Sequence, residues 1–387
     1  MKVLFAHDHF FVREGASFFS STGSFTNSVV ERYAKVFDNV LFLTRQKNLS
    51  EAQQSQRLSP IRVNNVSFKE VPDFKSLGTY HRISEAQKII NTSVRSADCL
   101  IARLPSSIGA IAIRYANKHQ KPYLIELVGC PWDALWNYGS LLARGLAPFA
   151  FLRTKRLVKN SRYVIYVSNE FLQNRYPTKG KSIGCSDVSI QELDEEVLEN
   201  RVEKIRSRQQ SDPVVLGTAA GIDVRYKGQQ YVIEALSKLV KLGYNFHYHL
   251  AGSGSKEFLT SVAERYGVID RVKFLGSIPQ ERIFDYSDSI DIYIQPSKQE
   301  GLPRALVEAM SRGCPAIGSL TGGIPELLDS EFIFRNGSVS DIVRKIRSFD
   351  IGKMEEQAKI NFEKAKEYER DVLEKRRESF LTEFRRS

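Results

Sequence analysis

The segment from Asp291 to Gly318 constrains the fold most, because it reads as one strand–loop–helix–strand unit. The run Asp291–Pro296 is rich in β-branched and aromatic residues, which is typical of a buried strand. Pro303 and Gly313 stand where a helix usually begins and ends. Pro315–Gly318 predicts the following strand. Strands that alternate with helices in this way, here and along the rest of the chain, predict a parallel sheet covered on both faces.

Two acidic residues in this unit indicate chemistry. Glu300 lies in the loop and Glu308 on the helix, and seven residues separate them. A carboxylate accepts two hydroxyl hydrogen bonds at once, so such a pair suits the hydroxyls of a sugar. Gly301 lets the backbone approach a ligand closely, and the helix start offers amides to phosphate. Either acid alone could be a solvated surface group, but Glu308 borders the apolar face near Leu306, where an uncompensated charge is costly.

The stretch Glu300–Glu308 resembles the Glu-x7-Glu motif of retaining GT-B glycosyltransferases, the large group often called family 4. The segments 313–317 and 322–326 are similar to those that follow this motif in the family. The resemblance extends upstream to about Leu216 and, more weakly, over the whole chain. It implies an α/β protein with two facing Rossmann-like, doubly wound domains and a cleft between them.

The resemblance also implies the division of the chain. Residues 1–190 would form an acceptor-binding domain, and residues 191–364 would bind the nucleotide-sugar donor. The last helix, about 365–387, would pack back on the first domain.

Within the resemblance, three residues would carry the donor site. Lys227, in a Lys-Gly pair before a helix, would hold the diphosphate. Glu308 would hold the ribose, and Glu300 would hold the donor sugar and support charge on its ring. The remaining substrate-binding candidates are Gly23, Arg225, Gly276, Ser277, Ser297, Gly301, Leu302 and Pro303.

Two positions depart from the family pattern. An arginine usually stands five or six residues before the lysine, where this chain has Gly221 and Ile222, so Arg225 is the nearest cation. Many members place a histidine where this chain has Gly129–Asp133, at the end of the predicted strand 123–128. Asp133 is the nearest polar residue there and becomes the second catalytic candidate, although an N-cap role fits it equally well.

The implied reaction moves a sugar from a UDP- or GDP-sugar to a glycan or lipid-linked acceptor, with retention of configuration, as in cell-surface polysaccharide synthesis. We expect no metal or other cofactor, because a lysine and a helix start would neutralise the diphosphate. One alternative is a GT-B sugar-nucleotide epimerase or hydrolase. Another is a non-catalytic sugar-nucleotide sensor or a partner subunit.

Charge is distributed unevenly. Residues 1–190 hold 26 Lys and Arg against 13 Asp and Glu, a balance of +13, whereas residues 191–387 hold 30 against 32. The basic half predicts an anionic membrane surface or a lipid-pyrophosphate as partner, or a merely solvated face. A basic half could also attract nucleic acid, which we do not expect here.

The stretch Leu135–Asn160 is leucine-rich and aromatic with a basic end, so it fits either a membrane-surface helix or, as we favour, a core helix with a basic edge. The four cysteines form no disulfide or metal pattern. No signal peptide or membrane-spanning run is evident. We therefore expect a cytoplasmic protein that can bind peripherally at the inner face of the membrane.

Overall fold

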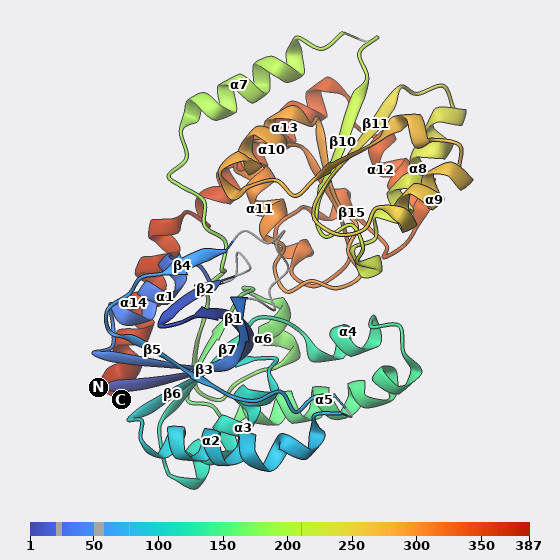
Figure 1. Cartoon of the computed structure of the whole chain (residues 1–387). Coiled ribbons are helices and arrows are strands. Elements are labelled where there is room, and N and C mark those ends of the chain that lie inside the picture. Colours follow the sequence, from blue (N-terminus) through green and yellow to red (C-terminus); the bar gives the residue numbers. More distant parts are fainter. Residues whose placement is uncertain (21–24, 50–57, 77, 210) are drawn as a thin grey trace. The chain divides into compact units, whose positions relative to one another are not determined.

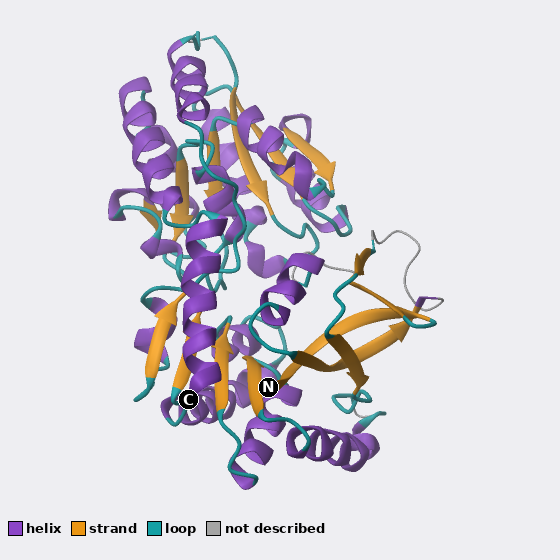
Figure 2. Cartoon of the chain, turned by 90° about the vertical axis from the view of Figure 1, so that its left-hand side faces the viewer, coloured by secondary structure: helices purple, strands orange, loops and turns teal. Residues whose placement is uncertain are grey.

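The computed structural model describes residues 1–20, 25–49, 58–76, 78–209 and 211–387, and it divides the chain into two units (Figure 1). The first unit consists of Met1–Pro131, Phe149–Asp187 and Glu374–Ser387, and the second of Trp132–Pro148 and Val188–Leu373. Each unit has its own sheet with helices on both faces (Figure 2).

In the described residues, the sheet of the first unit has nine strands. Seven of them are parallel in the order β5-β3-β1-β6-β7-β8-β9, while β2 pairs antiparallel with β1 and β4. Every residue of β6 is buried, as a central strand covered on both faces requires. The strands are β1 Lys2–Glu14, β2 Ser17–Ser20, β3 Asn39–Asn48, β4 Ser59–Ile61, β5 Val66–Glu70, β6 Cys99–Leu104, β7 Tyr123–Leu127, β8 Tyr163–Tyr166 and β9 Lys181–Gly184.

Strand β1 is longer than the sequence predicted. The run Lys2–Ala6 predicts a strand that ends at Ala6, but β1 continues to Glu14 and its far half forms a hairpin with β2. The register against β3 shifts between Ala6 and Phe10, so the strand bends there. Phe11 beyond the bend is fully buried and packs against Phe68. An irregularity of this kind breaks the two-residue period, which is why sequence periodicity missed it.

Seven helices of the described residues belong to or enter the first unit. Helix α3 begins after Ser106, whose hydroxyl accepts a hydrogen bond from the Gly109 amide at 2.9 Å. These helices are α1 Asn27–Ala34, α2 Ile83–Arg95, α3 Ser107–Lys118, α4 Pro131–Trp136, α5 Leu141–Lys159, α6 Phe171–Arg175 and α14 Arg370–Arg386.

The prediction that the stretch Leu135–Asn160 forms a core helix with a basic edge is wrong for α5. Leu141 is 83% exposed, Phe149 is 71% exposed and Leu152 is 61% exposed. The helix therefore presents large apolar side chains to solvent next to its basic residues. None of the helices in the described residues is both long enough and apolar enough to span a membrane.

In the described residues, the sheet of the second unit has six parallel strands in the order β12-β11-β10-β13-β14-β15. This is the doubly wound order, in which the chain changes direction between β10 and β13. The strands are β10 Val214–Ala219, β11 Phe246–Ala251, β12 Val272–Gly276, β13 Ile292–Gln295, β14 Ala316–Ser319 and β15 Ile333–Phe334. The helices are α7 Glu195–Arg206, α8 Gln229–Lys241, α9 Glu257–Arg265, α10 Ile283–Ser289, α11 Arg304–Met310, α12 Val339–Arg347 and α13 Ile351–Lys366.

The predicted strand–loop–helix–strand unit is confirmed as β13, α11 and β14. Helix α11 begins at Arg304, so Pro303 precedes it rather than starting its first turn. Gly313 follows its end with φ of +56°, a conformation that side chains rarely adopt.

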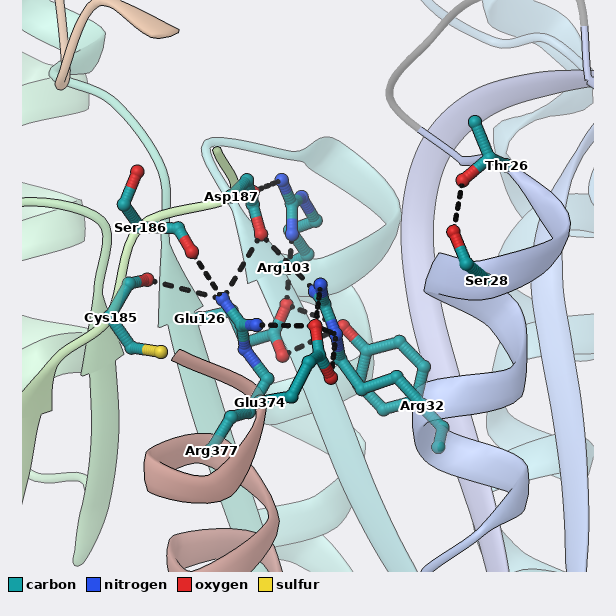
Figure 3. Close-up of polar contacts among 11 residues, drawn as sticks. Thr26, Ser28, Arg32, Arg103, Glu126, Cys185, Ser186, Asp187, Glu374 and Arg377 are labelled. Carbon is teal, nitrogen blue, oxygen red and sulfur yellow. Dashed lines mark hydrogen bonds and ion pairs between the residues drawn. The ribbon is translucent and has the colours of Figure 1, made fainter. Parts of the chain in front are cut away.

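A buried network of charges joins helix α14 to the rest of the first unit (Figure 3). Asp187 forms ion pairs with three arginines, Arg32, Arg103 and Arg377. Arg32 also binds Glu374 of α14 at 2.5 Å. Burial alone would raise the pKa of Asp187, but the three guanidinium groups outweigh it and hold the pKa below its usual range.

We predict that Asp187→Asn destabilises the first unit by about 3–5 kcal/mol, because it removes the one carboxylate that three buried arginines share. Chemical denaturation, with hydrogen exchange at β6 and α14 as a local readout, measures the loss. Asp38→Asn is the matched control, since Asp38 also pairs with α14, through Arg385, but is 53% exposed. An equal, small effect of both substitutions would contradict a structural role for the buried network.

Candidate active site

A cavity of about 500 Å³ lies in the second unit, beyond the carboxyl ends of β10, β11, β12 and β13. Ligands of doubly wound sheets bind at this edge, where the strand order reverses. The lining residues are Ala219, Ala220, Gly221, Lys227, Ala251, Gly252, Ser253, Ser277, Ile278, Gln280, Ile283, Gln295, Glu300, Leu302, Pro303, Arg304, Ala305 and Glu308. Three residues that the sequence singled out for chemistry, Lys227, Glu300 and Glu308, thus line one cavity.

Glu308 projects from α11 and is only 8% exposed, so it is not a surface acid. Its Oε1 accepts a hydrogen bond from Nε2 of Gln280 at 3.1 Å. The helix and this amide together fix the carboxylate in the cavity wall.

Glu300 forms an ion pair with Lys227, whose Nζ lies 2.6 Å from Oε1 of the carboxylate. Nε2 of Gln295 donates to the same oxygen at 3.1 Å. Both neighbours converge on Oε1, and no described residue donates to Oε2. Oε2 is therefore the oxygen available to hydroxyl groups of a ligand.

The orientation of the Gln295 amide is determined by its other partners. Its Oε1 accepts from the hydroxyl of Tyr293 at 3.0 Å, and Nε2 also donates to Oγ of Ser297 at 2.9 Å. Because an amide oxygen can only accept, the NH₂ group must face Glu300. Burial raises the pKa of Tyr293 well above its usual range, so its hydroxyl stays protonated as the donor.

Glycines let the loops around the cavity approach one another. A side chain at Gly228 would overlap the carbonyl of Pro296, and one at Gly322 would overlap the carbonyl of Glu300. Both glycines have positive φ, of +80° and +57°. The glycine-rich turn after β14 suggests from sequence a place for a ligand to approach closely, but in the structure Gly322 faces the loop that carries Glu300.

The other substrate-binding candidates differ in how they lie relative to the cavity. Ser277, Leu302 and Pro303 line the cavity, whereas Gly276 and Gly301 are adjacent to lining residues without belonging to them. Ser297 is fully buried and supports Gln295 instead of facing the cavity. Gly23 lies outside the described residues.

Arg225 and Asp133 are not part of this cavity. The guanidinium of Arg225 lies over the ring of Phe258 at 4.5 Å and lines a second cavity. Asp133 lies inside α4, not before it, so it is not the N-cap. In the described residues, no three His, Cys, Asp or Glu side chains gather as they would around a metal ion.

Sequence reasoning missed several lining residues. The turns 219–221 and 251–253 follow β10 and β11. The pattern Gly252-x-Gly254 is a weak signal by itself, since it lacks the third glycine of a dinucleotide fingerprint. Gln280, Gln295 and Arg304 were also missed. Arg304 directly follows the motif proline, so its position in the motif was the available signal for a second cation.

The chain was compared with known proteins. A family model described as glycosyl transferases group 1 matches residues 203–366. Protein CapJ of Staphylococcus aureus is 31% identical over 396 residues, which cover 100% of this chain and 96% of that protein. The amylovoran biosynthesis glycosyltransferase AmsK of Erwinia amylovora is 40% identical over 110 residues, 27% of each protein. The crystal structure of Anabaena HepE in complex with UDP-glucose is similar at a TM-score of 0.66 and 16% identity, over 99% of this chain and 100% of that one.

The fold and these similarities define the class as a glycosyltransferase with the GT-B fold. The chain belongs to the family of glycosyl transferases group 1. The predictions of a GT-B fold and of a glycosyltransferase are therefore confirmed.

We predict that Gln295 positions Glu300 for catalysis. Gln295→Glu replaces the amide donor by a second carboxyl group facing Glu300, and two such groups share a proton up to higher pH. The acid limb of the pH–rate profile of sugar transfer should therefore move to higher pH. Gln295→Leu should lower the turnover without moving that limb.

Gln357→Leu is the matched control for this experiment. Gln357 is also a buried glutamine of the second unit, and its amide bonds both the N–H and the carbonyl of Ala316, away from the cavity. It should lower stability and leave the pH–rate profile in place. If Gln295→Glu leaves the pH–rate profile as unchanged as Gln357→Leu does, Gln295 does not position Glu300 for catalysis.

Proposed function

We propose that the protein is a retaining, family 4 type glycosyltransferase that moves a sugar from a UDP- or GDP-sugar to a glycan or lipid-linked acceptor in cell-surface polysaccharide synthesis. The observation that carries the proposal is the meeting of Lys227, Glu300 and Glu308 in one cavity at the doubly wound switch point. Support for the donor class comes from HepE, which was crystallised with UDP-glucose. Support for the process comes from AmsK, which is named for amylovoran biosynthesis.

The cavity offers a separate partner for each part of such a donor. Lys227 and Arg304 would hold the diphosphate, since both are cations that line the cavity. Glu308 would accept hydrogen bonds from the ribose. We propose that these cations neutralise the leaving group and that the reaction needs no metal ion.

Glu300 would act on the transferring sugar. As the bond to the diphosphate breaks, positive charge develops on the sugar ring, and a carboxylate fixed by Lys227 and Gln295 stabilises it. Oε2 would accept sugar hydroxyls at the same time. The acceptor would attack on the face that the leaving group vacates, which retains the configuration without a covalent enzyme intermediate.

The catalytic prediction compares two substitutions. Glu300→Gln should lower turnover by about 10²-fold, because it removes a charge that acts mainly in the transition state. The affinity of Glu300→Gln for UDP, measured by calorimetry, should persist, since Lys227 no longer pairs with a carboxylate that competes with the diphosphate. Glu308→Gln should instead raise the donor KM, because ribose contacts are made equally in the ground and transition states.

Transfer by Glu300→Gln at the wild-type rate would contradict the role of Glu300. Binding of UDP without any sugar transfer by the wild-type protein would favour a sugar-nucleotide sensor. Release of UDP at the same rate with and without acceptor would instead favour a sugar-nucleotide hydrolase. The two assays together therefore separate the enzyme from both alternatives.

We also propose that α5 binds an anionic membrane surface peripherally, on the cytoplasmic side. Leu141, Phe149 and Leu152 are exposed on this helix, and Lys155 and Arg156 are basic residues of its last turns. Apolar side chains that enter the headgroup region beside basic residues are typical of interfacial helices. A lipid-linked acceptor would be reached from such a position.

The protein should sediment with vesicles that contain anionic phosphatidylglycerol, and it should be released as salt is raised. Phe149→Ser combined with Leu152→Ser should abolish most of this binding. Tyr80→Ser is the control, since Tyr80 is 61% exposed but lies outside α5. Equal binding to neutral and anionic vesicles, or by all variants, would contradict the proposal.

A further inference from the structure

The second unit contains another cavity, of about 540 Å³, that the proposed reaction does not use. Its walls combine cations, aromatic rings and amides, and no acidic residue of the described chain lines it. The lining residues are Trp136, Asn137, Arg144, Arg225, Tyr226, Gln230, Tyr231, Phe258 and Lys298.

Each of the three cations lies over an aromatic ring. Besides Arg225 over Phe258, Nζ of Lys298 lies 4.6 Å from the ring centre of Tyr231. The guanidinium of Arg144 lies 5.9 Å from the ring centre of Trp136. Such contacts hold a cation in place without neutralising its charge.

None of these three cations forms an ion pair with a described residue, in contrast to the balanced arginines around Asp187. Three unneutralised positive charges around one cavity create a local field that attracts an anion. The cavity therefore has the charge of an anion site and the flat apolar walls of a sugar site.

This cavity shares its supporting loops with the first one. The backbone N–H of Lys298 donates to the carbonyl of Tyr226 at 2.7 Å, which joins the loop after β13 to the turn Arg225–Lys227. Within that turn Arg225 lines the second cavity and Lys227 the first. In the loop, Lys298 lines the second cavity and Glu300 the first.

The amides of the cavity provide polar contacts. Nδ2 of Asn137 donates to the carbonyl of Lys298 at 3.2 Å, which holds α4 against the loop. Nε2 of Gln230 donates to the carbonyl of Arg225, but its buried Oε1 has no hydrogen-bond partner among the described residues. A hydroxyl group in the cavity could supply the missing donor.

We propose that this second cavity binds an acidic sugar, a hexose bearing a carboxylate or phosphate group, as part of the acceptor glycan. The inference rests on the proposed function, because it specifies the acceptor of that reaction. Aromatic faces pack against the C–H groups of a sugar ring, and arginine forms paired hydrogen bonds to carboxylate or phosphate. The shared loops would bring such an acceptor next to the donor cavity.

The two tryptophans of the chain make this binding directly measurable. Trp132 and Trp136 are the only tryptophans in the sequence, and their rings stack with centres 5.4 Å apart. Because Trp136 lines the cavity, intrinsic fluorescence reports its occupancy. The full-length protein would be titrated with glucuronic acid, glucose 6-phosphate and glucose.

We expect saturable fluorescence changes with an anionic sugar and none with glucose. Whichever of glucuronic acid and glucose 6-phosphate binds more tightly shows whether the cavity prefers a carboxylate or a phosphate group. Arg225→Gln and Lys298→Gln should each weaken this binding about tenfold, the loss of one charged hydrogen bond. Lys241→Gln, at an exposed position of α8 outside both cavities, is the control. Equal binding of all three sugars, no saturable binding, or equal affinity in all variants would overturn the proposal.

UDP calorimetry on the same variants separates this inference from the proposed function. Arg225→Gln and Lys298→Gln should bind UDP as the wild type does, since neither residue lines the donor cavity. If the wild-type protein does not bind UDP, the proposed function is contradicted. If it binds UDP but none of the acidic sugars, only the present inference is contradicted.

Discussion

The ion pair between Lys227 and Glu300 joins the two halves of the second sheet at the point where its strand order reverses. Lys227 follows β10 and Glu300 follows β13, and these strands are neighbours in the sheet. Two glycines permit the close packing of loops that brings the charges together, since Gly228 packs against Pro296 and Gly322 against Glu300. The cavity that contains Lys227, Glu300 and Glu308 is thus a consequence of strand order combined with the absence of side chains at a few turns.

A second layer of hydrogen bonds keeps the carboxylate in one orientation. Tyr293, Gln295 and Ser297 alternate along β13 and beyond its end. Tyr293 donates to Gln295, and Gln295 donates to both Ser297 and Glu300. Such a chain is satisfied only in one arrangement, because the amide oxygen of Gln295 cannot donate. We infer that the sheet interior, as well as the loop, determines where Glu300 points.

The two units use charge in opposite ways. Around Asp187 the arginines are neutralised by carboxylates, which suits a network that fastens α14 to its own sheet. Around the second cavity the cations rest on aromatic rings and remain uncompensated. The first arrangement contributes stability, and the second leaves attraction available for a ligand.

The sequence by itself indicated the family, through the resemblance of residues 300–308 and the segments after them to known glycosyltransferases. It also predicted the alternation of strands and helices and singled out Glu300 and Glu308, because these depend on local pattern and spacing. It also gave Lys227 its place before a helix. Only the tertiary structure decided which side chains share a cavity: Arg304 lines the same cavity as Lys227, Arg225 lies in the other cavity, and Ser297 is buried. It also decided that α5 exposes its leucines and that β1 continues through a bend. The physical reason is that burial and side-chain direction depend on contacts between segments distant in the chain, which local periodicity does not record.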